Sequence, residues 1–359
     1  MKVQVVRFLD RYFGGLLCII LGLFPRKRDS EGKSILCVQL WGIGESILTL
    51  PAISELKKVK VLVTERNKDV FNGYFDVEVI KTDPLSVFKF ILKNRNKYDI
   101  VIDFEEYLNV SSIISYFVGK RRIGFSHALR SRLYTDKVDY NDKQHCSQTF
   151  MDLMKPLGIE KEVKKLLPLK YGDRRVVDQF FDEVKIEKGD YLVGMSSGLA
   201  ESAKSRMWPL DRVAKVADYL IEKKNAKIVF IGSKEEKKLH DSIISKMKGD
   251  AINTCGKFNL IQTFDLIERM SLFIGNDSGP MHIGAAMGTK TIGLFGPNLP
   301  IRFGPVGGTG IYKGELCMYS PCINVHKGEV PNCYYKGEQY QKCMKNISVD
   351  DVLRVIEKP

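Results

Sequence analysis

The residues best suited to binding an anion lie in one stretch, 272–297, with the sequence LFIGNDSGPMHIGAAMGTKTIGLFGP. Its apolar start predicts a buried strand that ends in a turn, and Asp277, Ser278 and Gly279 then favour the start of a helix. The N–H groups and positive dipole at a helix N-terminus can hold a diphosphate, and His282, one turn later, can hydrogen-bond the same anion. Alternatively, Asp277 and Ser278 only cap the helix, and His282 is an ordinary core or surface histidine.

A second candidate phosphate site follows another predicted strand. Ser196 and Ser197 precede a glycine, and the two cations Lys204 and Arg206 stand shortly before Trp208. Hydroxyl and backbone N–H groups in such a loop bind phosphate oxygens, and a cation neutralises their charge. An arginine can also clamp a diphosphate with two hydrogen bonds. We therefore expect both serines and both cations to contact the diphosphate of a ligand.

A third set of candidate residues follows the predicted strand 226–231, where Gly232 and Ser233 lead into Glu235 and Glu236. A carboxylate at the end of a strand in a doubly wound sheet can accept hydrogen bonds from ribose hydroxyls. The pattern predicts that Gly232, Ser233 and Glu235 bind a nucleoside, with Glu236 as the alternative carboxylate. The competing interpretation is a charge in the first turn of a helix, which needs no ligand.

Glu45 is a further candidate residue, and its role as a catalytic base is what the family resemblance described below implies. It follows the predicted strand 35–40 and a turn that contains Gly42 and Gly44, and these glycines allow a tight passage from strand to helix. A carboxylate at this point can take the proton of an acceptor hydroxyl. The dinucleotide fingerprint G-x-G-x-x-G fails, because its third glycine would fall at Ile47, and this disfavours a nicotinamide dehydrogenase. In the alternative interpretation Glu45 only interacts with the helix N-terminus.

The elements that position these residues alternate between apolar strands and helical patterns. Further strands at 59–64, 77–80, 100–104, 122–125 and 291–295 predict an α/β fold with two doubly wound, Rossmann-like domains. Asp103 lies at a strand end, so it joins Gly42 and Gly44 as an acceptor-side candidate, with a solvated strand-end carboxylate as the alternative. We expect domains at 35–172 and 173–345, and a C-terminal helix in 346–359 that returns to the first domain.

The composition describes a globular chain with an excess of positive charge. Of 359 residues, 44% are hydrophobic and 28% charged, which excludes a disordered chain or one with many membrane spans. The net charge is +13, but no zinc-finger spacing, RNP-type motif or arginine-rich arm supports nucleic-acid binding. Anionic lipid and phosphate-bearing substrates explain the charge more economically.

The eight cysteines do not make a disulfide scaffold in a chain of this length, and most are expected to be reduced thiols. Cys317, Cys322, Cys333 and Cys343 cluster near the C-terminus, but their spacing matches no C-x-x-C pair. Structural zinc, a disulfide pair and free thiols all stay open for this cluster.

Residues 1–34 differ from the rest of the chain. The run 12–24, YFGGLLCIILGLF, carries no charge, and basic residues stand on both sides of it. Such a run is short for a membrane span, and no small-residue cleavage site follows it as in a secretory signal. We expect an apolar, amphipathic helix that lies in the surface of an anionic membrane. A helix packed on the first domain is the alternative.

Two of these stretches resemble the motifs of a known family. D-S-G-P-M-H-I-G-A-A-M-G-T at 277–289, followed by G-L-F-G-P, and L-W-G-I-G-E-S-I-L-T-L-P-A-I at 40–53 resemble glycosyltransferase family 9, the heptosyltransferases. The resemblance implies the GT-B fold, in which two Rossmann-like domains face a cleft, and sugar transfer with inversion from a nucleotide diphosphate. Glu45 stands where the family usually has an aspartate, thought to be the general base, and Arg206 where it commonly has a basic residue.

The resemblance also implies substrates and a location. The donor is expected to be a nucleotide sugar, with ADP-heptose as the leading candidate, and the acceptor a lipopolysaccharide or other lipid-linked saccharide. The enzyme would be cytoplasmic and peripheral on the inner face of the cytoplasmic membrane. The chain has no Asp-x-Asp pair, which agrees with a reaction that needs no metal or other cofactor. Two alternatives stay open: a membrane-tethered nucleotide-sugar-binding protein without transferase activity, and a nucleotide-sugar epimerase with the same two-domain plan.

Overall fold

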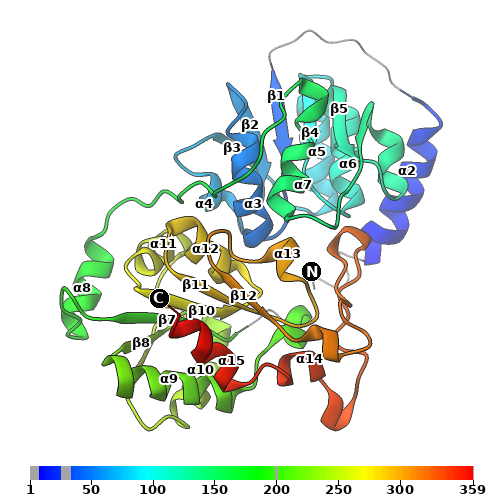
Figure 1. Cartoon of the computed structure of the whole chain (residues 1–359). Helices are drawn as coiled ribbons and strands as arrows, with labels where there is room; N and C mark the ends of the chain where they lie inside the picture. The colour runs from blue at the N-terminus through cyan, green and yellow to red at the C-terminus, as the bar shows by residue number, and fades with distance from the viewer. Residues whose placement is uncertain (1–7, 26–33, 199–200, 359) are drawn as a thin grey trace. The chain divides into compact units, whose positions relative to one another are not determined.

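The computed structural model describes residues 8–25, 34–198 and 201–358. The chain forms two compact units (Figure 1): unit 1 extends to Val163 and includes Val325–Gly328, and unit 2 comprises Lys164–Asn324 and the chain from Glu329 onward. Each unit contains one parallel six-stranded sheet. The predicted α/β fold with two Rossmann-like domains is confirmed. The boundary, however, falls at 163 instead of 172, because the segment that follows packs with unit 2.

The sheet of unit 1 has the strand order β3-β2-β1-β4-β5-β6. Its strands are β1 (Ile35–Val38), β2 (Val59–Val63), β3 (Asp76–Val79), β4 (Tyr98–Asp103), β5 (Gly119–Phe125) and β6 (Asp136–Val138). Strands β2 and β3 are added on one side of β1, and β4 to β6 are added on the other side. Sheets of this type bind ligands at the switch point between β1 and β4, beyond the carboxyl ends of the strands. Val38 pairs with Asp103, so the segments that follow β1 and β4 leave the sheet at the same edge.

The helices of unit 1 cover both faces of this sheet. They are η1 (Asp10–Gly14), α2 (Gly15–Gly22), α3 (Ile43–Ile53), α4 (Lys68–Phe71), α5 (Pro84–Asn94), α6 (Asn109–Val118), η2 (Leu129–Leu133), α7 (Cys146–Asp152), η3 (Lys155–Leu157) and η7 (Val325–Lys327). Helix α3 packs on α7, whereas α6 packs on β4 and β5 and also contacts α2 and α5. None of the helices in the described part of the chain is long and apolar enough to cross a membrane.

The N-terminal helix packs along α6. The carboxylate of Asp10 accepts hydrogen bonds from the backbone N–H groups of Asn109 (2.9 Å) and Val110 (2.8 Å), so it caps the N-terminus of α6. Helices η1 and α2 lie within the range 1–34 in which a helix is expected, and both pack on unit 1. The basic flanks at 1–7 and 26–33 lie outside the described residues.

Unit 2 repeats the topology of unit 1, with the order β12-β11-β10-β7-β8-β9. Its strands are β7 (Leu192–Ser196), β8 (Lys227–Phe230), β9 (Ala251–Asn253), β10 (Leu272–Asn276), β11 (Thr291–Phe295) and β12 (Thr309–Tyr312). Its helices are α8 (Arg175–Glu183), η4 (Glu201–Arg206), α9 (Leu210–Lys224), η5 (Lys234–Glu236), α10 (Lys237–Ile244), α11 (Leu260–Glu268), α12 (Gly279–Met287), α13 (Pro300–Phe303), η6 (Gly314–Leu316), η8 (Gly337–Gln339), α14 (Lys342–Lys345) and α15 (Val349–Ile356).

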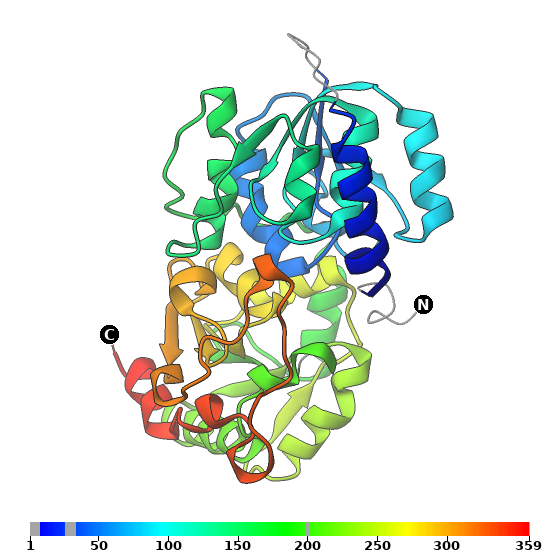
Figure 2. The same ribbon diagram turned by 90° about the vertical axis from the view of Figure 1, so that its right-hand side faces the viewer.

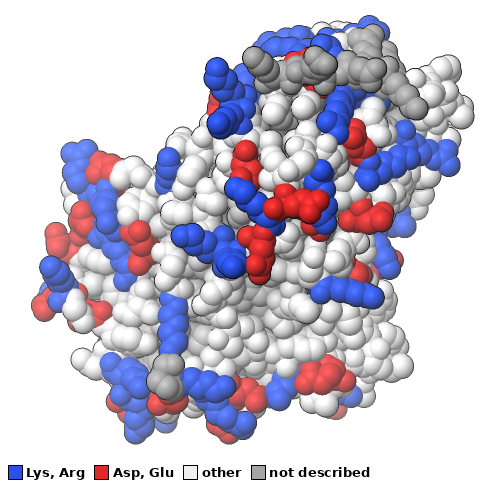
Figure 3. Space-filling model, turned by 45° about the horizontal axis from the view of Figure 1, so that its top comes forward, with Lys and Arg blue, Asp and Glu red and all other residues white. Residues whose placement is uncertain are grey.

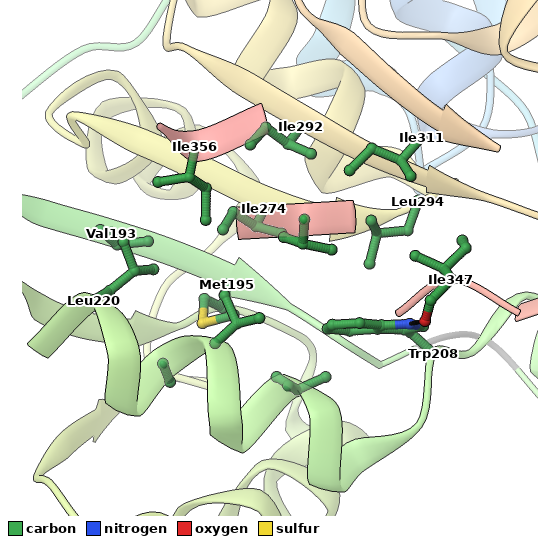
Figure 4. Packing of buried hydrophobic residues seen from close by; sticks show 14 of the residues in the cluster. Val193, Met195, Trp208, Leu220, Ile274, Ile292, Leu294, Ile311, Ile347 and Ile356 are labelled. Atoms are coloured by element: carbon green, nitrogen blue, oxygen red, sulfur yellow. Dashed lines mark hydrogen bonds between the residues drawn. The ribbon is translucent and has the colours of Figure 1, made fainter. Parts of the chain in front are cut away.

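The core of unit 2 includes the C-terminal helix. Trp208 is 1% exposed, and its indole Nε1 donates a hydrogen bond to the Ile347 carbonyl at 3.0 Å (Figure 4). Val352 and Ile356 of α15 belong to the same buried cluster, and α15 contacts α9 and β12. The prediction that this helix returns to the first domain is therefore wrong, because its apolar face completes the core of unit 2.

Candidate functional site

In unit 1 the segment after β1 makes a tight turn into α3. Gly42 directly precedes α3 with φ 77°, and half-buried Glu45 lies in the first turn of the helix. A Cβ on Gly42 would lie 1.9 Å from Oε2 of Glu45, so the carboxylate lies directly over the glycine. Only glycine meets both conditions. Gly44 is buried within the same turn.

Glu45 shares a small pocket with two further carboxylates, Glu105 and Glu106, and with Trp41. Its volume is ≈ 10 Å³, which is room for about one water-sized group. Glu106 is 4% exposed, and its carboxylate accepts a hydrogen bond from the Tyr140 hydroxyl. We did not predict Glu106 from the sequence, because a third acid after a strand carries no distinctive signal.

The buried Glu105 carboxylate holds the loop that leads to Glu45. Its Oε1 accepts hydrogen bonds from the backbone N–H groups of Leu40 (2.6 Å) and Trp41 (2.8 Å). Burial, with the neighbouring Asp103 as the second cause, raises the pKa of Glu105 to about 8. Glu105 therefore fixes the backbone of the turn and does not face solvent.

Asp103 is not available to an acceptor. Its carboxylate and the Arg130 guanidinium are both fully buried and form an ion pair with a 2.8 Å distance between Nη2 and Oδ2. The Tyr134 hydroxyl donates to the same oxygen at 2.7 Å, and Arg130 also donates to the Ser111 hydroxyl at 3.1 Å. The acceptor-side role and the solvated alternative predicted for Asp103 are both wrong, since this carboxylate stabilises the interior of unit 1.

In unit 2 the segment after β10 leads into α12. Ser278 directly precedes this helix in an extended conformation, and no side chain caps the helix. The Ser278 hydroxyl instead donates to the Asn276 carbonyl at 3.1 Å, so the predicted capping by Asp277 and Ser278 does not occur. In the first turn of α12 the N–H groups of Gly279 and Met281 have no partner within the helix, since Pro280 has no N–H and the His282 N–H donates to the Ser278 carbonyl at 3.4 Å. His282, 4% exposed, lies in the first turn.

Arg206 is held beside the start of α12. Its Nη1 donates to the Asp277 carbonyl at 3.0 Å and lies 3.3 Å from the Asp277 carboxylate, which also accepts from Asn298 at 3.0 Å. The Nε–H of Arg206 is buried and has no hydrogen-bond partner among the described residues. A buried donor of this kind is costly unless a ligand oxygen satisfies it. Lys204 is exposed, and its backbone carbonyl accepts a hydrogen bond from the Gln341 side chain.

The loop after β7 is fixed from two sides. Ser196 and Ser197 are both buried, and the Ser197 carbonyl accepts a hydrogen bond from the Asn276 amide at 3.1 Å. The Ser197 N–H donates to Nε2 of His240 on α10 at 3.2 Å. The first connection places the predicted phosphate-binding loop next to the end of β10, and the second ties it to α10. Asn276 and His240 were not predicted as site residues, because neither belongs to a motif that indicates such a role.

His240 and Cys255 form a buried pair behind this loop. Nδ1 of His240 lies 2.7 Å from the Cys255 sulfur, and because Nε2 accepts from Ser197, the ring proton is on Nδ1. Burial lowers the pKa of His240 to about 4 and raises the pKa of Cys255 to about 12. Both side chains are therefore uncharged near pH 7.

Glu236, the alternative carboxylate, contacts the two glycine loops. Its Oε2 accepts from the Ser233 N–H at 2.7 Å, and a Cβ on Gly198 would lie 2.3 Å from its Oε1. A Cβ on Gly232 would lie 2.7 Å from Oε2. Glu235 is exposed. The structure thus brings Gly232, Ser233 and Glu236 together next to Gly198, whereas the exposed Glu235 carboxylate interacts with the Ser233 side chain.

The four C-terminal cysteines are free thiols. Among the residues that the structure describes, no group of three or more His, Cys, Asp or Glu side chains is arranged to hold a metal ion. Burial raises the pKa of Cys322 to about 11 and of Cys343 to about 12, which keeps both protonated. Neither the disulfide pair nor the zinc site considered for this cluster is supported.

The excess of positive charge is not gathered in one nucleic-acid groove on the face shown in Figure 3. Lys and Arg side chains are interspersed there with Asp and Glu.

Comparisons with known proteins show what the chain is similar to. The family described as glycosyltransferase family 9 (heptosyltransferase) matches residues 87–322. The chain is similar to the lipopolysaccharide core heptosyltransferase OpsX of Haemophilus influenzae, with 25% identity over 293 residues, 76% of this chain and 82% of that protein.

Two solved structures share the fold. A glycosyl transferase family 9 protein from Veillonella parvula superposes with a TM-score of 0.75 at 23% identity, covering 92% of this chain and 98% of the other. The E. coli ADP-heptose lps heptosyltransferase II superposes with a TM-score of 0.66 at 17% identity, covering 90% and 97%.

Proposed function

The chain belongs to glycosyltransferase family 9, and we propose that it transfers heptose or a similar sugar, with inversion, from a nucleotide diphosphate to a lipopolysaccharide or other lipid-linked acceptor. ADP-heptose is the leading donor, as in the name of the E. coli relative. The observation that carries this proposal is the buried Nε–H of Arg206, which lacks a partner among the described residues and lies beside the uncapped start of α12. A diphosphate supplies the missing acceptor oxygens.

Unit 2 holds the leaving group in this scheme. When the bond from the anomeric carbon to the diphosphate oxygen breaks, its electron pair stays on that oxygen. The first N–H groups of α12 and the Arg206 guanidinium stabilise the negative charge that develops there. Asp277 does not oppose this, because Arg206 and Asn298 already satisfy its carboxylate. Ser196 and Ser197 bind the same diphosphate, and Gly232, Ser233 and Glu236 bind the nucleoside.

Unit 1 supplies the base. The acceptor hydroxyl oxygen attacks the anomeric carbon from the side opposite the diphosphate, and its proton passes to the Glu45 carboxylate. Glu105 positions the turn that carries Glu45 through its bonds to Leu40 and Trp41. Glu45 is the carboxylate that takes up the proton in this scheme, and the chain has no Asp-x-Asp pair for a metal-bound diphosphate.

The N-terminal helix supports a membrane location for the proposed enzyme. A lipid-linked acceptor resides at a membrane, and η1 and α2 expose a row of large apolar side chains: Tyr12, Phe13, Leu16, Leu17 and Ile20. We place the enzyme on the cytoplasmic side, with this helix lying in the anionic inner face of the membrane without spanning it.

The proposal is tested by a transfer assay with purified full-length protein and a panel of ADP-, UDP-, GDP- and TDP-sugars. We expect turnover with an ADP-sugar and a saccharide acceptor, unchanged by EDTA. Turnover of the donor without any acceptor would instead indicate an epimerase. Tight nucleotide binding without turnover would indicate a binding protein.

Replacing His240 should weaken donor binding only where the new side chain cannot accept the hydrogen bond of the Ser197 N–H. In His240→Leu the Ser197 N–H loses its partner, so we expect the KM for the donor to rise about tenfold at unchanged kcat. Gln at this position keeps an oxygen at similar reach and should stay within about twofold of wild type. Equal effects of both replacements would show that the imidazole only fills space.

The same pair of variants has a pH signature. Because the pKa of folded His240, about 4, lies below the ordinary value of 6.5, the folded state disfavours its protonation. Its contribution to stability is therefore complete above pH 6.5 and is lost as the pH falls towards 4. Thermal unfolding across this window should show a smaller acid-induced loss in His240→Gln than in wild type.

A further inference from the structure

A second helix of unit 1 also exposes large apolar side chains. On α5, Leu85, Phe88 and Leu92 are 61%, 57% and 58% exposed, and their spacing of three and four places them along one face. The opposite face of α5 is buried through Val87 and Phe90. Surface helices normally present polar residues to solvent, so an outward apolar stripe marks a contact surface.

Helix α2 presents its apolar side chains outward because its small residues face inward. Gly14, Gly15 and Cys18 are buried, and a Cβ on Gly14 would lie 2.9 Å from Asn109 at the start of α6. The large side chains are left on the outside: Phe8, Tyr12, Phe13, Leu16, Leu17, Ile20, Leu23 and Phe24 are 44–70% exposed.

Helices α2 and α5 both rest on α6. Leu21 of α2 and Ile91 of α5 pack against one cluster that contains Tyr116 of α6. The Tyr116 hydroxyl donates to the Phe24 carbonyl at 2.7 Å, which fixes the end of α2 beside the end of α6. Figure 2 shows α2 in dark blue and α5 in cyan on this side of unit 1. An open hollow beside the end of α2 and α6 is lined by Leu21, Leu23, Phe24, Pro25, Tyr116 and Phe117.

The charged side chains on α2, α5 and α6 themselves are all basic. Residues 84–97 contain Lys89, Lys93, Arg95 and Lys97, all exposed, and no Asp or Glu. Residues 11–25 and 109–118 also contain no Asp or Glu, and the first of these ranges contains an exposed Arg11.

The nearest carboxylates have other partners. Asp10 caps α6, Asp83 accepts from the Ser86 N–H at 3.0 Å at the start of α5, and Glu78 lies 3.6 Å from the Lys93 ammonium. An apolar face with cations around it is complementary to an anionic bilayer. Two copies of the same face would bring like charges together, which disfavours a dimer through it.

We propose that the exposed sides of α2 and α5, which both pack on α6, form one surface that docks unit 1 on an anionic lipid bilayer. Phe88 and Leu92 enter the headgroup region together with the side chains of α2, while Lys89 pairs with lipid phosphates and Lys93, 73% exposed, shares its charge between them and Glu78. The proposal rests on the membrane-borne acceptor of the proposed function. Two separate helices in contact with the bilayer fix the orientation of unit 1, which one helix alone would leave free to rotate about its axis.

The test is flotation of the full-length protein with vesicles of phosphatidylcholine, alone or mixed with phosphatidylglycerol. We expect binding to the mixed vesicles and little to the neutral ones. The double variant Phe88→Ser with Leu92→Ser should weaken binding at least about tenfold, because two apolar side chains no longer leave water. Lys89→Ala with Lys93→Ala should also weaken it about tenfold, with a loss that shrinks at high salt.

A matched control is Leu316→Ser with Met318→Ser, two exposed apolar residues of unit 2, which should bind as wild type. Circular dichroism establishes that each variant is folded. Wild-type binding by the Phe88 and Leu92 variant would overturn the proposal, since α2 alone would then be the anchor. Equal binding to neutral vesicles would also overturn the proposal. The same holds if light scattering shows a wild-type dimer that the Phe88 and Leu92 double variant dissociates. Transfer to a water-soluble acceptor fragment should stay at the wild-type level, so loss of docking and failure of the proposed activity are distinguishable.

Discussion

Glu45→Gln should lower kcat by at least about 100-fold, because the amide cannot accept the proton of the acceptor hydroxyl. The replacement keeps the shape of the side chain over Gly42, so the turn and the fold should be unchanged. Donor affinity should also stay within about twofold, since unit 2 binds the nucleotide in our proposal. The measurement is steady-state transfer kinetics together with calorimetric titration of the donor.

Two further variants locate the base. Glu45→Asp restores the residue that the family usually has, but its carboxylate lies one methylene closer to the backbone, so we expect activity between those of wild type and Glu45→Gln. Glu106→Gln removes another carboxylate from the same pocket. A larger loss of kcat in Glu106→Gln than in Glu45→Gln would assign the base to Glu106 and refute our assignment.

Arg130→Met should lower the free energy of unfolding by about 3–5 kcal/mol, because it leaves the buried Asp103 carboxylate without its ion-pair partner. The Tyr134 hydroxyl and the Glu105 N–H still donate to that carboxylate, but neither carries a charge. Urea denaturation followed by circular dichroism measures the loss. It should appear in the absence of any substrate, which separates it from an effect on catalysis.

A comparison of the buried ion pair with an exposed ion pair tests whether burial causes the loss of stability. Lys161→Met removes an ion pair with Glu55 in the same unit, in which the two side chains are 57% and 25% exposed, and it should cost only a small fraction of the loss at Arg130. Asp103→Leu combined with Arg130→Met removes both buried charges and should recover part of the stability. A loss at Arg130 no larger than that at Lys161 would contradict the role that we assign to the buried pair.

The sequence by itself determined which segments carry the site. The runs that became β1, β7, β8 and β10 are apolar, each ends at small or turn-forming residues, and a helical pattern follows, so their polar residues had to lie at the carboxyl edge of a sheet. These signals are local, because backbone preference and apolar periodicity act over a few residues. The edge strands β6, β9 and β12 were missed, since three or four partly exposed residues carry almost no periodicity.

Only the tertiary structure decided what individual polar residues do. Asp103, Glu105 and Glu106 are close in sequence, yet the first pairs with buried Arg130, the second holds the Leu40 backbone and the third bonds Tyr140. Each partner is distant along the chain, so no local pattern separates the three roles.

The same dependence on distant partners decides where the apolar faces of two helices lie. The sequence of α15 predicts an apolar face but not the domain on which this face packs. Only its packing in the buried cluster around Trp208 assigns the helix to unit 2. Helix α5 likewise carries apolar side chains on two opposite sides. Only its packing on the rest of unit 1 decides which side stays exposed to water. Local chemistry thus specifies the elements and their ends, whereas burial and long-range partners determine whether a charged or apolar side chain serves binding, catalysis or stability.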